Sequence, residues 1–425
     1  MTQVGTVKLK YGLGTIAVNI PERASTAFLR PNDLDAMQDF DSAFLRALDN
    51  PISSLSLEHL ARENGTRPVV VIVNDPTRLA NSDRFVHPLL NYLNRAGVPD
   101  GQVSVVFACG SHRPLNDREM DEILGAGIRK RVTCLNHDAR DQSSLVYCGT
   151  TSRGTPVWLN KTVAAAGLRI LTGSIVHHFM AGFGGGRKAL VPGVAGHETI
   201  QRNHAMMLCD GSEIGRLDGN PLHLDLLEAA RMAGGGFLVN VVLNQRHEFA
   251  GVFCGDMEKA HLAGCEMVEH LSGVELPWSA DLVIASCGGY PKDINMYQAQ
   301  KTLDNAAQAC KRGGHIVFLA ECRNGVGSDT YHDWAVRYKT LPELESALRE
   351  HFVLGGHKAY AVGKLLSRAT IWLVSSLPES TARELGFRCA GNAQDAIDSA
   401  LQAAGHGARV LVMPEGSITV PRRNS

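Results

Sequence analysis

The sequence predicts an α/β fold made of two α/β domains, with mostly parallel sheets and the active site in the cleft between them. Short apolar runs rich in β-branched residues, such as Val69–Val73, alternate with stretches whose apolar residues recur at helical spacing. Glycine and proline lie at the turns between these runs, as at Asp75-Pro76. The segment Ser272–Pro277 then interrupts the alternation before a second strand–helix series.

The first series predicts an N-terminal α/β domain over residues 1–275. We expect strands at 69–74, 102–108, 168–171, 237–243 and 251–254. Helical patterns pass through Phe85–Leu93 and cover 118–124, 163–167 and 257–271. Ligands of such sheets bind just beyond the carboxyl ends of the parallel strands, so residues at those ends are the first candidates for a site.

The second series predicts a smaller C-terminal α/β domain over residues 276–413. We expect strands at 281–286, 315–320, 371–375 and 408–413, and helices at 298–312, 341–351 and 393–404. Residues 414–425 end in a short basic stretch and are expected to form a solvated tail.

The composition excludes several classes of protein. The chain has 42 basic and 43 acidic residues, so neither nucleic acid nor an anionic membrane is an expected partner. The N-terminus has no apolar leader, and no apolar run approaches the roughly 20 residues that span a bilayer. The ten cysteines show no C-x-x-C spacing. We therefore expect a cytoplasmic protein with reduced thiols, and the sequence assigns no oligomeric state.

Polar residues follow two of the expected strands. Asp75 and Arg78 come after the first strand, where arginine suits a carboxylate ligand and Asp75 can orient a histidine or cap a helix. His112 follows the next strand within Gly110–Pro114, a plausible position for a general base. A capping aspartate beside a surface arginine is the plainer interpretation of the first pair.

A glycine-rich basic loop carries the strongest local pattern. Gly182 and Gly184–Gly186 precede Arg187 and Lys188, and such a loop suits a phosphate-bearing ligand. The loop matches neither the nucleotide-triphosphate loop nor the dinucleotide fingerprint. A tight turn with a solvated lysine explains the glycines equally well.

Four histidines surround this loop, namely His177, His178, His197 and His204. Their number favours a functional site over isolated core histidines, because imidazole serves both metal ligation and proton transfer near neutral pH. Their spacing does not match H-E-x-x-H.

In the second domain, Tyr297, Gln298 and Lys301 open an expected helix after the segment Gly288–Asp293. Residues three and four apart share a helix face, so these side chains can converge on an anionic substrate. An ordinary amphipathic helix start is the alternative.

Together these segments resemble the nickel-dependent lactate racemase family. The matching motifs are D-x-T-R at 75–78, G-S-H-R-P at 110–114, the block from His178 to His204, and G-G-Y-P with N-x-Y-Q-A-x-K at 288–301. The long block is the most specific motif, because both Lys188 and His204 stand at the family's spacing from His178.

The resemblance implies a cofactor and a set of roles. The cofactor is a nickel-pincer nucleotide, a pyridinium-3,5-bisthiocarboxylic acid mononucleotide that holds nickel and is covalently linked through Lys188. His204 would be the protein's nickel ligand, and His112 and His178 the acid/base pair. Asp75, Gly185 and Gly186 would support the cofactor. Arg78, Tyr297, Gln298 and Lys301 would bind the substrate, a small 2-hydroxy acid.

The implied reaction avoids an unstable carbanion. The α-hydrogen of a hydroxy acid is a poor acid, so its removal as hydride by an electron-poor pyridinium is easier than its removal as a proton. Two neutral imidazoles can accept the hydroxyl proton of either enantiomer. Cofactor-maturation proteins are the further partners that this chemistry implies.

Two positions depart from the family pattern. His177 stands where the family commonly has proline, and His357 aligns roughly with a tryptophan of the lactate enzyme. Loss of an apolar wall suggests a substrate larger or more polar than lactate, such as an aldonate undergoing 2-epimerisation. Lactate racemisation itself is the alternative. A zinc-dependent hydrolase and a non-catalytic protein that binds a phosphorylated ligand are the rival classes.

Overall fold

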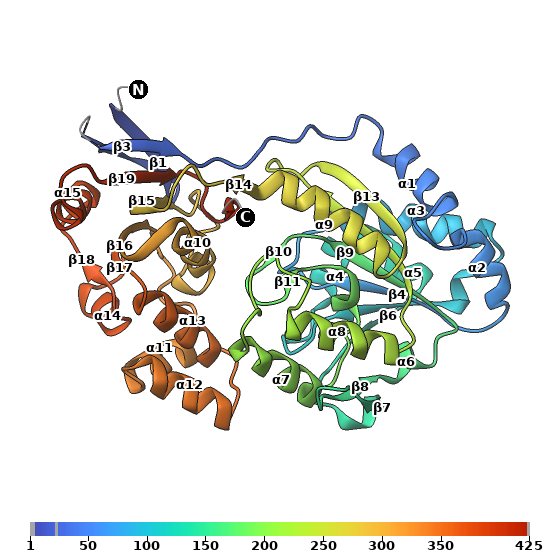
Figure 1. Ribbon diagram of the computed structural model, residues 1–425. Helices are drawn as coiled ribbons and strands as arrows, with labels where there is room; N and C mark the ends of the chain where they lie inside the picture. Colours follow the sequence, from blue (N-terminus) through green and yellow to red (C-terminus); the bar gives the residue numbers. More distant parts are fainter. Residues whose placement is uncertain (1–4, 22–23, 423–425) are drawn as a thin grey trace. The chain divides into compact units, whose positions relative to one another are not determined.

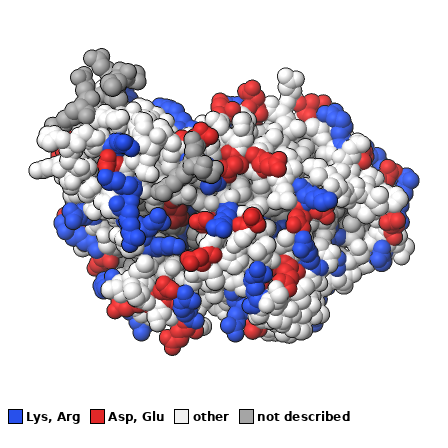
Figure 2. Space-filling view, in the orientation of Figure 1, with Lys and Arg blue, Asp and Glu red and all other residues white. Residues whose placement is uncertain are grey.

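The computed structural model describes residues 5–21 and 24–422, which form two compact units (Figure 1). The N-terminal unit is Asp33–Leu271. The C-terminal unit combines Ser272–Ser425 with Met1–Asn32. Acidic and basic side chains both occur across the face of the molecule shown in Figure 2, as expected from the balanced composition.

A six-stranded sheet organises the N-terminal unit. Its order is β13 (Phe249–Asp256), β12 (Phe237–Leu243), β9 (Leu168–Ser174), β4 (Val69–Asn74), β5 (Val103–Ala108) and β6 (Thr133–Asn136). Only β13 runs antiparallel to its neighbour. The run Val69–Val73 is fully buried because helices and loops cover both faces of this central strand.

Two apolar clusters cover the sheet. One joins the sheet to Phe44 of α1, Leu57 of α2 and Leu89 of α3. The other joins Val242 of β12 to Val268 of α9. The helices of this unit are α1 (Phe40–Asp49), α2 (Leu57–Asn64), α3 (Ser82–Arg95), α4 (Asp117–Leu124), α5 (Ile128–Arg131), α6 (Lys161–Ala164), α7 (His197–Ala205), α8 (Pro221–Met232) and α9 (Lys259–Ser272).

Two small hairpins complete the unit. Strand β7 (Leu145–Thr150) pairs with β8 (Pro156–Asn160), and β10 (His177–His178) pairs with β11 (Gly182–Phe183). The second hairpin leads into a short 3-10 turn, η3 (Gly186–Ala189), which carries the basic end of the glycine-rich loop.

A fully parallel six-stranded sheet organises the C-terminal unit. Its order is β18 (Arg388–Cys389), β17 (Thr370–Val374), β16 (Cys310–Leu319), β15 (Ala280–Ser286), β19 (Arg409–Met413) and β3 (Ser25–Phe28). The helices are α10 (Met296–Ala309), α11 (Asp329–Arg337), α12 (Leu341–Glu350), α13 (Gly356–Leu366), α14 (Glu379–Glu384) and α15 (Ala393–Ala404).

The two ends of the chain depart from the predicted boundaries. The N-terminal segment, expected in the N-terminal domain, instead supplies β3 as an edge strand beside β19. It also forms the hairpin of β1 (Thr6–Tyr11) and β2 (Gly14–Asn19), whose Leu9 and Val18 lie in the core of the C-terminal unit. The expected tail is also structured, because β20 (Val420–Arg422) pairs with β14 (Gly273–Glu275).

The expected helix at 298–312 also ends early. Strand β16 already begins at Cys310, and its Gly313 has a φ of +78° that a helix does not allow. All ten cysteines are free thiols. Among the described residues, no helix is both long and apolar enough to cross a membrane.

Candidate active site

A carboxylate and a histidine meet at the carboxyl ends of β4 and β5. Nδ1 of His112 lies 2.7 Å from Oδ2 of Asp75, while the backbone N–H and hydroxyl of Thr77 donate to Oδ1. Burial acts to raise the pKa of Asp75, but the hydrogen bonds from His112 and Thr77 outweigh it and lower that pKa. Because an ionised carboxylate only accepts, Nδ1 of His112 carries a proton in this contact, and the lone pair of the neutral ring then lies on Nε2.

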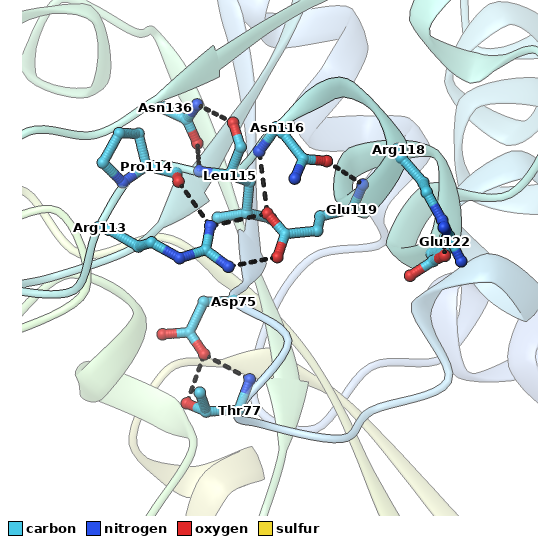
Figure 3. Close-up of polar contacts among 10 residues, drawn as sticks. All are labelled: Asp75, Thr77, Arg113, Pro114, Leu115, Asn116, Arg118, Glu119, Glu122 and Asn136. Atoms are coloured by element: carbon cyan, nitrogen blue, oxygen red, sulfur yellow. Dashed lines mark hydrogen bonds and ion pairs between the residues drawn. The ribbon is translucent and has the colours of Figure 1, made fainter.

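The loop that presents His112 is held from both sides. Gly110 takes a φ of +53° and donates its N–H to the carbonyl of Gly193 at 2.9 Å. Arg113 pairs with Glu119 of α4 through contacts of 2.8 and 2.5 Å (Figure 3). The His112 side chain remains 49% exposed, so a ligand can reach it.

The hairpin of β10 and β11 assigns different roles to two adjacent histidines. His177 pairs with Glu269 of α9 at 2.9 Å and lies against the ring of Phe183. Neighbouring strand residues point to opposite sides, so His178 faces the other way. Its Nε2 lies 3.2 Å from Nζ of Lys188. His178 and Lys188 therefore face each other on one side of the hairpin, while His177 is paired on the other side.

The glycines of the loop face protein and allow close packing. A Cβ on Gly185 would lie 2.6 Å from Asn240 Oδ1, and one on Gly186 would lie 2.6 Å from the ring of His261. The Gly186 N–H donates to the same Asn240 oxygen at 2.8 Å. The sequence left both an anion site and a tight turn open for these glycines, and their close packing against β12 and α9 gives one physical reason for glycine at both positions.

Arg187 points into the protein beneath this loop. It is 1% exposed and donates to the carbonyl of Ala181 at 2.8 Å, with His261 at 3.2 Å from its other terminal nitrogen. Burial lowers the pKa of Arg187 to about 10, so it remains charged at neutral pH. Its neighbour Lys188 emerges on the side of His178.

Burial and nearby positive charge both disfavour a charged ammonium at Lys188. Burial lowers the pKa of Lys188 well below its ordinary value, and the charges of Arg187 and Arg78 lower it further. Burial, with Lys188 and Arg78 as the next causes, likewise lowers the pKa of His178 well below its ordinary value and that of His204 to about 3. The exposed Arg78 is thus close enough to act on this whole group.

Helix α7 places His204 in its last turn, where the side chain is 8% exposed. The preceding residue, Asn203, donates to the fully buried carboxylate of Asp225 in α8 at 2.9 Å. Thr151 and Thr155 donate to the same carboxylate at 2.5 and 2.9 Å. These partners lie far apart in the sequence and formed no recognisable motif.

The described residues contain no group of three or more His, Cys, Asp or Glu side chains that could hold a metal. A metal bound by protein side chains alone, as the hydrolase interpretation requires, therefore has no ligand set in the described part of the chain. A single buried, uncharged imidazole at His204 instead fits a metal whose other ligands come from a bound cofactor.

The C-terminal unit holds the remaining predicted residues at the start of α10. Asn295 caps the helix by accepting from the Gln298 N–H at 2.9 Å. Lys301 donates to the Gln298 side chain at 3.0 Å, and the partly buried Tyr297 contacts α13. Gln298 and Lys301 therefore meet in the first turns of α10, whereas the ring of Tyr297 is directed to α13.

A second polar group, which the sequence did not indicate apart from His357, lies next to Tyr297. His357 of α13 is 4% exposed, and its ring meets that of Tyr297 edge-on at 6.5 Å. The buried Lys358 places its ammonium 5.1 Å from the centre of the same Tyr297 ring and donates to Gln300. Gln300 in turn donates to Asp304 at 2.6 Å, and burial raises the pKa of Asp304 to about 6.

Known proteins match this chain over nearly its whole length. The family model of the lactate racemase N-terminal domain matches residues 11–215, and that of the C-terminal domain matches residues 277–420. A lactate racemase from Thermoanaerobacterium thermosaccharolyticum is 30% identical, over 99% of this chain and 100% of that protein. A lactate racemase from Lactiplantibacillus plantarum is 34% identical, over 87% of this chain and 88% of that protein.

Solved structures of two other proteins have the same fold as this chain. The lactate racemase apoprotein from T. thermosaccharolyticum superimposes with a TM-score of 0.90 at 29% identity, covering 98% of this chain and 100% of that one. A protein from Thermotoga maritima shares the fold, with a TM-score of 0.66 at 17% identity over 93% of this chain and 100% of that one.

The α/β fold, the two matching domain models and the named relatives define this chain as an enzyme of the isomerase class, a racemase. It belongs to the lactate racemase family.

Proposed function

We propose that the chain inverts the hydroxyl-bearing α carbon of a 2-hydroxy acid, as a racemase or epimerase that depends on a nickel-pincer nucleotide. When bound, this group supplies the hydride acceptor and donor that the α carbon requires. The observation that carries the proposal is the presence of two imidazoles suited to proton transfer at neutral pH. One is His112, oriented by Asp75, and the other is His178, held uncharged by burial.

The residues present fit such a cofactor. Lys188 offers an amine for covalent attachment, and the buried imidazole of His204 offers a nickel ligand. The positive charges of Arg78 and Arg187 act on the same group of side chains, which suits an anionic nucleotide. Maturation proteins that make and load the cofactor are the partners that this assignment requires.

In the proposed reaction, each imidazole serves one enantiomer. Nε2 of His112, which holds the lone pair of the neutral ring in the Asp75 contact, accepts the hydroxyl proton when one enantiomer is oxidised and returns it when that same enantiomer is formed again. Once Lys188 is linked to the cofactor, Nε2 of His178 no longer faces a free amine, and it does the same for the opposite enantiomer. Tyr297, Gln298 and Lys301 are assigned to the substrate carboxylate, because amide, phenol and ammonium donors all lie in the first turns of α10.

For the substrate we propose a 2-hydroxy acid larger or more polar than lactate, such as an aldonate. The support is polar chemistry beside Tyr297, where His357 and Lys358 are both buried. Lactate itself is the second candidate, favoured by the names of the two relatives.

A substrate panel decides between these candidates. Protein produced together with the cofactor-synthesis machinery is incubated with each enantiomer of lactate and with a series of aldonates, and products are separated by chiral chromatography. Highest kcat/KM on an aldonate supports the proposal, whereas highest kcat/KM on lactate refutes the polar-tail assignment and leaves lactate racemisation in place.

An isotope experiment tests the class of chemistry. The best substrate is prepared with deuterium on the α carbon and inverted in ordinary water. Hydride transfer keeps deuterium on that carbon in the product. Loss of deuterium to solvent at the rate of inversion would show proton abstraction instead and would remove the hydride mechanism.

A further inference from the structure

We propose that Lys188 is held in the apoprotein as an uncharged, nucleophilic amine by hydrogen donation from His178, ready to be acylated by an activated carboxyl group. His178 thus has a role before any turnover, as the group that prepares the attachment site. The natural electrophile would be a thiocarboxyl carbon of the cofactor, so this assignment rests on the proposed function. The test described below needs neither cofactor nor substrate.

The hydrogen-bond pattern around His178 fixes its proton. The backbone N–H of Ala181 donates to Nδ1 of His178 at 3.3 Å, so Nδ1 is the acceptor. A neutral imidazole with an accepting Nδ1 carries its proton on Nε2. That nitrogen is the one 3.2 Å from Nζ of Lys188. An Nε2–H donor facing Nζ requires a lone pair on Nζ, and only the uncharged amine has one.

The charges around Lys188 act in the same direction. The groups that face it are Arg187 on its own turn, Arg78 after β4, His178 on β10, His204 on α7 and His261 on α9. Two of these are permanently positive, and none is acidic. No Asp or Glu of the described residues forms an ion pair with Lys188, so an ammonium there would lack a counter-charge.

The acylation step balances with this arrangement. The Nζ lone pair attacks the carbonyl carbon, an Nζ–C bond forms, and the bond from that carbon to the leaving group breaks. One proton leaves Nζ and one reaches the leaving group, and His178 Nε2 is placed to exchange protons with Nζ. With p-nitrophenyl acetate as the probe, the products are an acetamide on Lys188 and p-nitrophenol.

The experiment measures acetylation of the apoprotein by p-nitrophenyl acetate between pH 6.5 and 9, mapped by peptide mass spectrometry. Lys130, an exposed residue of the same unit, is the internal reference. The rate at an ordinary lysine rises about tenfold per pH unit, because its uncharged fraction does so below its pKa. We expect the rate at Lys188 to be flat over this range. A tenfold rise per unit at Lys188 would overturn the proposal.

Two variants of nearly equal shape test the part played by His178. His178→Gln keeps an uncharged N–H donor, and the flat profile at Lys188 should persist. His178→Glu places a carboxylate beside Nζ, stabilises the ammonium, and should slow acetylation at pH 7 by about tenfold or more while restoring the ordinary pH slope. A flat profile in His178→Glu would contradict the role of His178.

The acetylation rates test the state of Lys188, whereas substrate inversion tests the proposed function, so either claim can fail without the other. His178→Gln should lose inversion of substrate yet keep the reactive lysine, which a merely structural role would not produce. Should the Glu variant fail to fold, the wild-type pH profile still decides whether Lys188 is uncharged. Conversely, a flat wild-type profile in a protein that inverts no hydroxy acid would retain this inference and reject the racemase assignment.

Discussion

Nδ1 of His112 lies 2.7 Å from Oδ2 of Asp75, although the two residues follow different strands of the N-terminal sheet. They meet because β4 and β5 are parallel neighbours whose carboxyl ends share one edge. The contact selects the tautomer of His112 and keeps its Nε2 available as a base. The rate of inversion should therefore depend on Asp75, although its carboxylate does not need to touch the reacting carbon.

Asp75→Asn should lower kcat by about 10²-fold or more with little change in KM, because an amide can hold the wrong imidazole tautomer. The measurement is the initial rate of inversion with cofactor-loaded protein, at saturating and at low substrate. Thr77→Val, which removes a hydroxyl bond to the other carboxylate oxygen, is the control and should cost far less. Equal losses in the two variants would contradict a tautomer-selecting role.

Substitutions of the adjacent His177 and His178 should have very different effects on the rate of inversion. His178→Gln should abolish inversion, whereas His177→Gln should leave kcat within a few-fold of wild type, because His177 is committed to Glu269 on the opposite side of β10. Glu269→Gln provides a matched test of the same ion pair. Loss of activity in both His177→Gln and Glu269→Gln, with retention in His178→Gln, would reverse the assignment.

The central strands were predictable because a buried strand consists of consecutive apolar residues, which are visible in the sequence. Val69–Val73 is an uninterrupted apolar run and Phe237–Leu243 is interrupted only by Asn240, and the bounds of β4 and β12 are those predicted. Strand β3 was missed, because Ser25–Phe28 is short, mixed in polarity and only partly buried. Its pairing depends on an open edge at β19, which is nearly 400 residues away and leaves no local pattern.

The candidate site likewise contains residues that local motifs predict and residues that only the fold brings together. His112, His178, Lys188 and His204 lie in motifs whose spacing is visible in the sequence. Asp225 was not found, because its partners Thr151, Thr155 and Asn203 are separated from it by 74, 70 and 22 residues. A buried polar contact between distant residues depends on the fold and not on spacing.

A substitution at Asp225 tests how much these buried hydrogen bonds stabilise the fold. Asp225→Asn replaces an acceptor of three hydrogen bonds by a group that must also donate, and should lower the free energy of unfolding by about 2–3 kcal/mol. Thermal unfolding measures the change, which should appear as a fall in Tm of about 5–10 °C. Glu228→Gln, three positions later on α8 and bound to the exposed Ser152, should change Tm little. A neutral Asp225→Asn would show that the carboxylate does not anchor α7.

Stability should fall in mild acid, and His223 should account for part of that fall. Burial, with the charges of Arg187 and Arg231, lowers the pKa of His223 to about 3, against an ordinary value of about 6.5 in the unfolded chain. Between these values the unfolded chain binds one more proton than the folded one. The free energy of unfolding therefore decreases as pH falls below about 6.5, by about 1.4 kcal/mol per pH unit for this group.

Urea unfolding at pH 7 and pH 5 checks this sign and size. His223→Gln should reduce the loss of stability between the two pH values by about 2 kcal/mol, whatever it does to stability at pH 7. The exposed His87, changed to Gln, is the control and should leave the pH dependence unchanged. An identical pH dependence in wild type and His223→Gln would mean that His223 can be protonated in the folded protein.

The identity of the substrate should respond to a single side chain in α13. His357→Trp replaces a buried ring, which accepts the N–H of Gly355 at 3.0 Å and meets Tyr297 edge-on, by a larger apolar surface. If His357 provides polar room for the substrate tail, the variant should lower kcat/KM for an aldonate and raise it for lactate. The ratio of kcat/KM for lactate to kcat/KM for the aldonate should change by about tenfold or more, which corresponds to the contact energies of one pocket wall.

His357→Phe separates ring size from polarity, because it removes the imidazole nitrogens without adding the second ring. An unchanged ratio in both variants, in protein that remains folded and loaded, would show that His357 supports Tyr297 and does not select the substrate.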